Sequence, residues 1–179
     1  MTIPVDQFGL FGPDPINGRW CKPPPGYLKL NVDGSFRDGR ATFAGVLRDH
    51  RGVWMWGFTG VSHVSSSLAA ELHALSQGLM LLIQRHAFRT LIEPDSSEAI
   101  NLLHDYVEPE HPLSAQLVTC KSLHRQLWSS PVFWTVRSCN MLADGLAKFG
   151  HMLGDSPCFV FFDSCPPQLE ELLLQDTIM

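Results

Sequence analysis

The chain has 179 residues, of which 45% are hydrophobic and 17% are charged, proportions typical of one globular domain with tails. No apolar run is long enough to cross a bilayer, and the N-terminus lacks a basic stretch followed by an apolar core, which argues against a membrane span and a secretory signal. The net charge of −5 argues against a basic duplex-binding module, unless bound cations reverse the local sign.

The first part of the chain predicts a tail followed by three strands. Residues 1–19 show neither a helical nor a strand period, and we expect a poorly ordered tail there. Alternation of apolar and polar side chains predicts strands over Tyr27–Ser35, Ala41–Asp49 and Val53–Val61. We expect Asp33-Gly34 to end the first strand in a turn, and a hairpin connection to join the second strand to the third.

The rest of the chain predicts four helices and two further strands. The serine cluster at residues 65–67 offers caps for a long helix that runs to about Gln84 with a leucine-rich stripe. The later elements that we expect are, in chain order, a strand around Leu91-Ile92, a short helix from Ser96 or Ser97 to about His104, a helix from Pro112 to about Leu127, a strand over Val132–Val136 and a helix capped by Asn140.

This element order predicts an α/β fold with one mixed five-stranded sheet flanked by helices. A three-strand antiparallel meander comes first, and crossover connections then make the two later strands parallel. We expect a flexible N-terminal tail at 1–19, the domain at 20–150 and a C-terminal extension at 151–179. The extension contains an apolar run, Phe159–Phe162, and a segment that could form a short helix, Leu169–Leu174, and neither predicts a function.

Four carboxylates fall where this element order would bring them together. Asp33 and Asp95 end predicted strands, while Glu71 and Asp144 lie in the first turns of two helices. Glu71 is the informative residue, because it sits at the edge of the apolar stripe, where a carboxylate is costly unless a cation meets it. Two divalent cations about 3.5–4 Å apart can activate a water and stabilise the leaving oxygen of a phosphodiester, and Mg²⁺ prefers such oxygen ligands.

Each carboxylate also has a simpler interpretation. An aspartate at a strand end is usually a turn residue, and a glutamate in a first helical turn usually complements the helix dipole. Spacing alone therefore leaves both a nuclease hypothesis and a structural interpretation open. The five cysteines form no Cys-x-x-Cys pair and the eight histidines form no zinc motif, so we expect reduced thiols in an intracellular protein of the nucleus or cytoplasm.

Short motifs in the expected order resemble the plant ribonuclease H-like domain, which is similar to the ribonuclease H part of non-LTR retrotransposon polyproteins. The motifs are KLNVDGS at 29–35, GVLRD at 45–49, AAELHAL at 69–75, Asp95-Ser96, and NMLADGLAK at 140–148. Each motif is short, but together they are specific, and the resemblance spans roughly residues 20–150.

The resemblance implies a ribonuclease H-like fold and a monomeric endonuclease that cleaves the RNA strand of RNA–DNA hybrids. The four carboxylates described above would be the catalytic ligands of two Mg²⁺ or Mn²⁺ ions, with Asp33 between the ions. Contacts to 2′-hydroxyls would distinguish a hybrid from a DNA duplex. Substrate contacts would come from residues close to the carboxylates, namely Gly34, Ser35, Arg137 and Asn140.

Two positions depart from the family pattern. Trp134 stands where active relatives carry a histidine that is thought to help proton transfer and product release, which predicts a slower enzyme. Pro94 precedes Asp95 inside the expected fourth strand, where a proline removes a ladder donor and could shift the carboxylate.

These departures keep two other hypotheses open. The chain could be a catalytically weak, domesticated retrotransposon relic that binds nucleic acid or a protein partner. It could also be a fragment of a transposon polyprotein with no independent role. One fold serves many functions, so the fold by itself does not choose among them.

Overall fold

The computed structural model describes residues 18–156 and 158–178, so the tail predicted at 1–19 lies almost entirely outside the described residues. Five strands form one mixed sheet in the order β4-β1-β2-β3-β5. β1 pairs with β4 in parallel, and every other neighbouring pair is antiparallel. The strands are β1 (Leu28–Arg37), β2 (Arg40–Arg48), β3 (Trp54–Ser62), β4 (Thr90–Pro94) and β5 (Cys158–Phe162).

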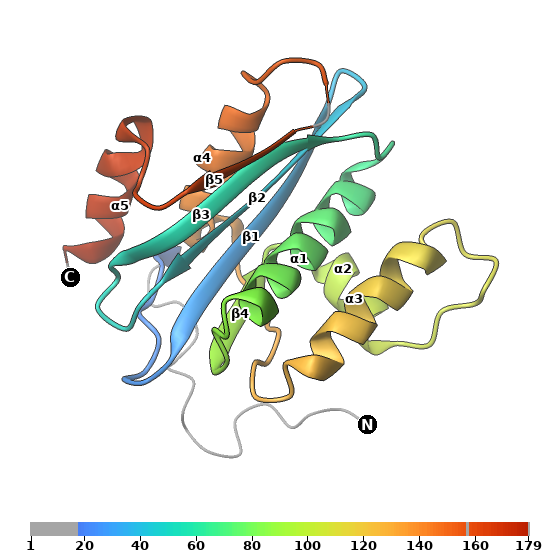
Figure 1. The fold of residues 1–179 in the computed structure, drawn as a ribbon, viewed down its shortest axis with the longest axis horizontal. Helices are drawn as coiled ribbons and strands as arrows, with labels where there is room; N and C mark the ends of the chain where they lie inside the picture. Colours follow the sequence, from blue (N-terminus) through green and yellow to red (C-terminus); the bar gives the residue numbers. More distant parts are fainter. Residues whose placement is uncertain (1–17, 157, 179) are drawn as a thin grey trace.

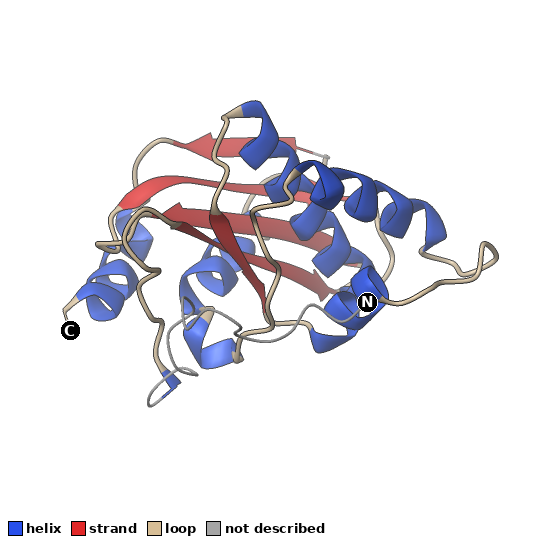
Figure 2. Cartoon of the chain, turned by 90° about the horizontal axis from the view of Figure 1, so that it is seen from below, coloured by secondary structure: helices blue, strands red, loops and turns tan. Residues whose placement is uncertain are grey.

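Helices cover both faces of this sheet, which makes three layers (Figures 1 and 2). Figure 1 shows α1, with α2 and α3 beside it, on one face, and α4 with α5 on the other. The described helices are α1 (Ser67–Gln84), α2 (Ser97–His104), α3 (Ser114–Gln126), α4 (Met141–Gly150) and α5 (Glu170–Thr177). Within the described ranges, no helix is both long enough and apolar enough to span a membrane.

The first hairpin turns later than the sequence predicted. β1 continues without a break through Asp33 and Gly34, and the turn forms at Asp38 and Gly39, where φ is +52° and +74°. Positive φ costs glycine nothing and is tolerated by aspartate, so the Asp-Gly pair at 38–39 is the better turn former. The consequence is that Asp33 lies in the middle of a strand, with Ala44 as its partner on β2.

Alternation along the strands divides the core between the two helix layers. Leu30 and Val32 of β1 are fully buried in the cluster on the α1 side. Ala44 and Val46 of β2 face α4 and pack with Leu142, among others. The sheet is therefore buried on both faces near its centre, as strands in a three-layer α/β fold are.

The predicted strand at Val132–Val136 forms only an isolated parallel bridge between Val132 and Ile92. Ile92 donates to the Pro131 carbonyl at 3.0 Å, and Phe133 donates back to the Ile92 carbonyl at 2.8 Å. Thr135 also donates to the Pro94 carbonyl at 3.1 Å, but Pro94 has no N–H to donate in return, so the pairing stays an isolated bridge. The expectation of two later parallel strands was therefore wrong in one of the two cases, although the mixed five-stranded α/β sheet was predicted correctly.

The fifth strand comes from the C-terminal extension instead. The apolar run Phe159–Phe162 lies in β5, which pairs antiparallel with β3 from Gly57 to Val61 and covers that edge of the sheet. α5 follows and covers part of the α4 layer (Figure 1).

A buried guanidinium holds α5 in place. Arg48 at the end of β2 is 0% exposed, and its Nη1 lies 2.7 Å from a carboxylate oxygen of Asp176 in α5. Its Nη2 donates to Asn31 at 3.0 Å, and the guanidinium carbon lies 3.5 Å from the ring centroid of Trp20. The segment before β1 and the C-terminal helix therefore meet at one buried cation.

Candidate metal centre

Asp33 is the central residue of the site, and β1 fixes its position. It is 5% exposed and points to the same face of the sheet as its β2 partner Ala44, because directly paired residues share a face. The turn interpretation of Asp33 is excluded, since the strand runs on for four more residues to Arg37.

Glu71 reaches Asp33 because a glycine follows Asp33 in β1. A Cβ built at Gly34 would lie 2.2 Å from the carbonyl carbon of Ala70 and from the backbone nitrogen of Glu71, so no other residue allows β1 to come this close to α1. The helix begins at a cap in which the Ser66 hydroxyl accepts from the Ala69 N–H at 3.1 Å, as the serine cluster predicted. This cap and this glycine together place Glu71, in the second turn of α1, against the strand.

Asp95 arrives from β4, immediately after the last residue of that strand. The parallel register pairs Val32 with Pro94, so the next residue on each strand is a carboxylate, Asp33 on one and Asp95 on the other. Pro94 is tolerated because β4 is the edge of the sheet and the proline is its final residue. The shift that the sequence led us to expect does not separate the two aspartates.

Carboxylate oxygens of Asp33, Glu71 and Asp95 lie within 4.8 Å of one another. Burial, followed by the charges of Asp95 and Asp144, raises the pKa of Asp33 to about 8. Burial, followed by the charges of Asp33 and Asp95, raises the pKa of Glu71 to about 9, and its Oε2 is buried without a hydrogen-bond partner. Burial also raises the pKa of Asp95. Crowded, desolvated carboxylates of this kind are what a hard divalent cation requires, so these residues fit a metal.

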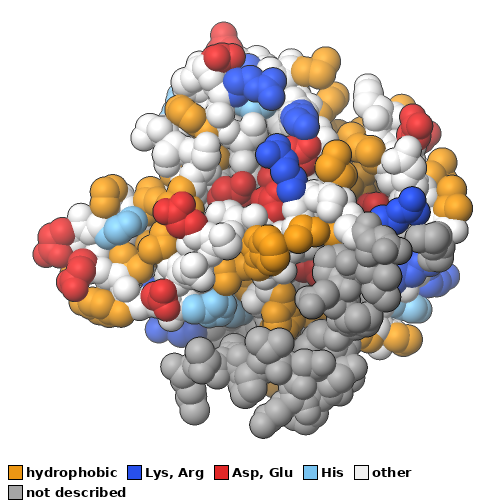
Figure 3. Space-filling view, turned by 180° about the vertical axis from the view of Figure 1, so that it is seen from behind, with side chains coloured by type: hydrophobic (Ala, Val, Ile, Leu, Met, Phe, Trp, Pro, Cys, Tyr) orange, Lys and Arg blue, Asp and Glu red, His pale blue; other side chains and the backbone are white. Residues whose placement is uncertain are grey.

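Asp144 lies close to these three residues but already has cationic partners. It is 4% exposed, and its two oxygens contact Arg137 at 3.3 Å and Lys148 at 2.5 Å. Lys148 lies one helical turn after Asp144, a spacing that brings side chains together on α4. Asp144 therefore lies beside the carboxylate cluster, defined here as Asp33, Glu71 and Asp95, with its charge balanced by basic side chains. Figure 3 shows acidic side chains gathered near the middle of one face, with Lys and Arg side chains beside them.

The residues predicted to touch substrate differ in how exposed their side chains are to solvent. Asn140 is 1% exposed and donates to the Val32 carbonyl at 2.9 Å, so it holds α4 against β1 and is closed to a ligand. It occupies the N-cap position of α4, as predicted, but its side chain makes no capping hydrogen bond. Arg137 keeps 75% of its side chain exposed despite its contact with Asp144. The Ser35 hydroxyl lies 2.9 Å from Nε2 of His151.

The sequence interpretation assigned no role to Lys148 or His151. The i, i+4 spacing of Asp144 and Lys148 is a signal that could have revealed the first. His151 follows α4 and meets Ser35 on β1, 116 residues away in the chain, and a contact of that range leaves no local pattern.

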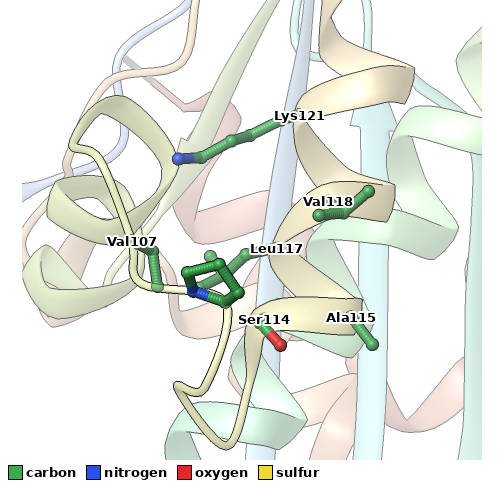
Figure 4. A pocket seen from close by; sticks show the side chains of 7 residues that line it. Val107, Ser114, Ala115, Leu117, Val118 and Lys121 are labelled. Atoms are coloured by element: carbon green, nitrogen blue, oxygen red, sulfur yellow. The ribbon is translucent and has the colours of Figure 1, made fainter.

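A concavity of about 480 Å³ lies between α3 and the segment that follows α2 (Figure 4). Apolar groups make up most of its lining, including Val107, Leu117 and Val118, and no carboxylate lines it. Catalytic chemistry therefore points to the carboxylate cluster and not to this concavity.

Comparison with protein families matches most of the chain to one family. Residues 31–150 match the family described as reverse transcriptase-like. A curated relative from Arabidopsis thaliana, named "Putative ribonuclease H protein", is 34% identical over 161 residues, which cover 89% of this chain. That alignment covers 26% of the relative, so the chain spans about a quarter of the length of the curated protein that it matches.

Solved structures share the fold. The N-terminal RNase H domain of a Mycobacterium tuberculosis protein, solved as a fusion with maltose binding protein, gives a TM-score of 0.63 at 22% identity and covers 69% of this chain and 92% of its own. RNase H1 of Halobacterium salinarum gives 0.63 at 20% identity, with 71% and 98% covered. LC11-RNase H1 in complex with an RNA/DNA hybrid gives 0.60 at 17% identity, with 68% and 94% covered.

Proposed function

Because the chain belongs to the reverse transcriptase-like family and carries a plant ribonuclease H-like domain, we propose that it is a divalent-metal-dependent endoribonuclease that cleaves the RNA strand of RNA–DNA hybrids. The observation that carries this proposal is the carboxylate cluster, whose oxygens lie within 4.8 Å of one another. Without a cation such a cluster only destabilises the fold, because desolvation and like charge both oppose ionisation. The relative's name and a neighbour's complex with an RNA/DNA hybrid support the substrate class.

Asp33, Glu71 and Asp95 would hold two Mg²⁺ or Mn²⁺ ions, which supply Lewis-acid polarisation of the phosphate and a more acidic bound water. Asp144 completes the acidic set, and its contacts with Arg137 and Lys148 fix its carboxylate beside the cluster. The exposed part of Arg137 offers a guanidinium that can orient a substrate phosphate in a bidentate manner.

The rest of the site is held by groups that do not touch the reacting atoms. Asn140 fixes α4 against β1 through its bond to the carbonyl of Val32, the residue before Asp33. Gly34 keeps β1 and α1 in backbone contact. These contacts set the separation of Asp33, Glu71 and Asp144, and metal geometry tolerates little displacement of its ligands.

Cleavage of an end-labelled RNA–DNA hybrid tests the proposal, with the full chain in Mg²⁺, in Mn²⁺ or in EDTA. We expect RNA-strand cleavage that depends on the metal and is lost in Asp33→Asn. Asp33→Asn should also lose the rise in thermal midpoint that the metal produces in the wild type. Folded wild-type protein that cuts no hybrid in either metal would contradict the proposed activity.

One observation favours a second function. Trp134 stands in place of the family's histidine and is 54% exposed, a feature that suits a weakly active or inactive domain retained to bind nucleic acid or a protein partner. Tight hybrid binding without metal-dependent cleavage would support that function. Trp134→His would then test whether this position limits the activity.

A further inference from the structure

Trp134 is an exposed tryptophan on a fixed backbone. Its exposed fraction is 54%, whereas its neighbours Val132 and Thr135 are 6% exposed. Phe133 donates to the Ile92 carbonyl at 2.8 Å and Thr135 to the Pro94 carbonyl at 3.1 Å, so the backbone on both sides of Trp134 is bonded to β4. Large aromatic side chains bury most of their surface in folded proteins, so an exposed indole on a hydrogen-bonded backbone requires an explanation.

The indole is attached to the carboxylate cluster itself. Its Nε1–H donates to the backbone carbonyl of Asp95 at 3.1 Å, and the carboxylate of the same Asp95 belongs to the cluster. The ring therefore lies at the rim of the cluster and does not fill it. Three residues further on, the side chain of Arg137 is 75% exposed. Figure 3 shows hydrophobic surface next to the acidic and basic side chains in the middle of this face.

We propose that Trp134 is a stacking platform for a nucleotide of the substrate next to the phosphate that is cut. This inference rests on the proposed function and names a further positioning residue for it. An open indole face accepts a base or a ribose, and Arg137 is placed to meet the adjoining phosphate. Because every base has a π face, the platform strengthens binding without a preference for sequence.

Trp128 provides a matched control for exposed aromatic surface. It is 90% exposed and follows the end of α3. Ser130, two residues later, accepts a hydrogen bond from the Thr90 N–H at the start of β4, whereas Asp95 follows the other end of that strand. The five residues of β4 place Trp128 and Trp134 at opposite ends of a strand about 16 Å long.

The test compares Trp134→Ala, Trp134→Phe and Trp128→Ala, each in full-length protein. Dissociation constants for a fluorescently labelled RNA–DNA hybrid are measured in an Asp33→Asn background, so that the hybrid stays intact, and KM and kcat for cleavage are measured without that background change. Loss of base stacking corresponds to roughly 5- to 150-fold in affinity. We expect Trp134→Ala to raise Kd and KM by about 10-fold, and Trp134→Phe and Trp128→Ala to stay within about 3-fold of the parent.

Each outcome is informative. Unchanged Kd and KM in Trp134→Ala, or an equal loss in Trp128→Ala, would overturn the platform. A Trp134→Phe protein as weak as Trp134→Ala would also overturn it, because the hydrogen bond to Asp95, and not the ring, would then be the functional part. Tighter binding by Trp134→Ala would identify the indole as an obstruction. Wild-type protein without cleavage would contradict the proposed function, while the Kd comparison would still decide the platform.

Discussion

Substitution of Asp176 by alanine should destabilise the whole domain, although Asp176 lies near the C-terminal end of the described chain. The change removes the carboxylate partner of the Arg48 guanidinium, which is fully buried in the wild type. Burial already lowers the pKa of Arg48, and the charge of Asp176 opposes that shift. Removing one partner of a buried ion pair costs about 3–5 kcal/mol, because the remaining charge stays desolvated.

The lower end of this range applies here. The Asp176 side chain is 17% exposed, so water can reach the guanidinium when the carboxylate is removed, and Asn31 remains as a hydrogen-bond partner. We therefore expect a loss of about 3 kcal/mol. For a domain of this size that loss lowers the thermal midpoint by about 6–12 °C.

Urea unfolding and calorimetry of the full chain measure this loss. The midpoint should fall with an unchanged m-value, and Asp163→Asn, at an exposed position between β5 and α5, should stay within about 0.5 kcal/mol of the parent. An Arg48→Met, Asp176→Leu double variant should recover much of the stability, since apolar replacements of a buried pair are often close to neutral. An Asp176→Ala protein within about 0.5 kcal/mol of wild type would refute the reasoning, because α5 would then not depend on the buried pair.

Two further predictions concern the carboxylate cluster. Gly34→Ala should lower the free energy of unfolding in urea by about 1–3 kcal/mol or more, because its Cβ would lie 2.2 Å from the Ala70 backbone. Gly154→Ala is the control and should be neutral, because its Cβ would meet nothing within 4 Å. Equal effects of the two changes would contradict this prediction. In EDTA, stability should fall as the pH rises from about 4 to about 9. Burial and neighbouring negative charges raise the pKa of Asp33 to about 8 and that of Glu71 to about 9, so above the pKa of an unfolded carboxyl, about 4, the folded state holds protons that the unfolded state releases. Saturating Mg²⁺ should reduce this fall, so a metal-induced shift in thermal midpoint that is the same at low and high pH would argue against a metal at these carboxylates.

Local patterns were sufficient to predict most of the architecture. Alternation along β1 and the leucine stripe of α1 depend on which face of each element is buried, and burial sets those patterns within a few residues. The position of Glu71 at the edge of an apolar stripe was informative for the same reason, because a carboxylate there needs a cation. The motifs around Asp33, Glu71 and Asp95 then identified the family, and the structure brings those three residues together.

Contacts between distant segments decided the rest. The sequence cannot show that Asp144 is balanced by Arg137, that Asn140 turns inward to Val32, or that Arg48 is buried beneath Asp176, because each contact depends on how whole elements pack. The apolar run of β5 and the apolar segment at Val132–Val136 look alike as patterns. Pro94 withholds a donor from one of them, and β3 offers a free edge to the other, so pairing between strands, and not propensity within a strand, determined which one joined the sheet.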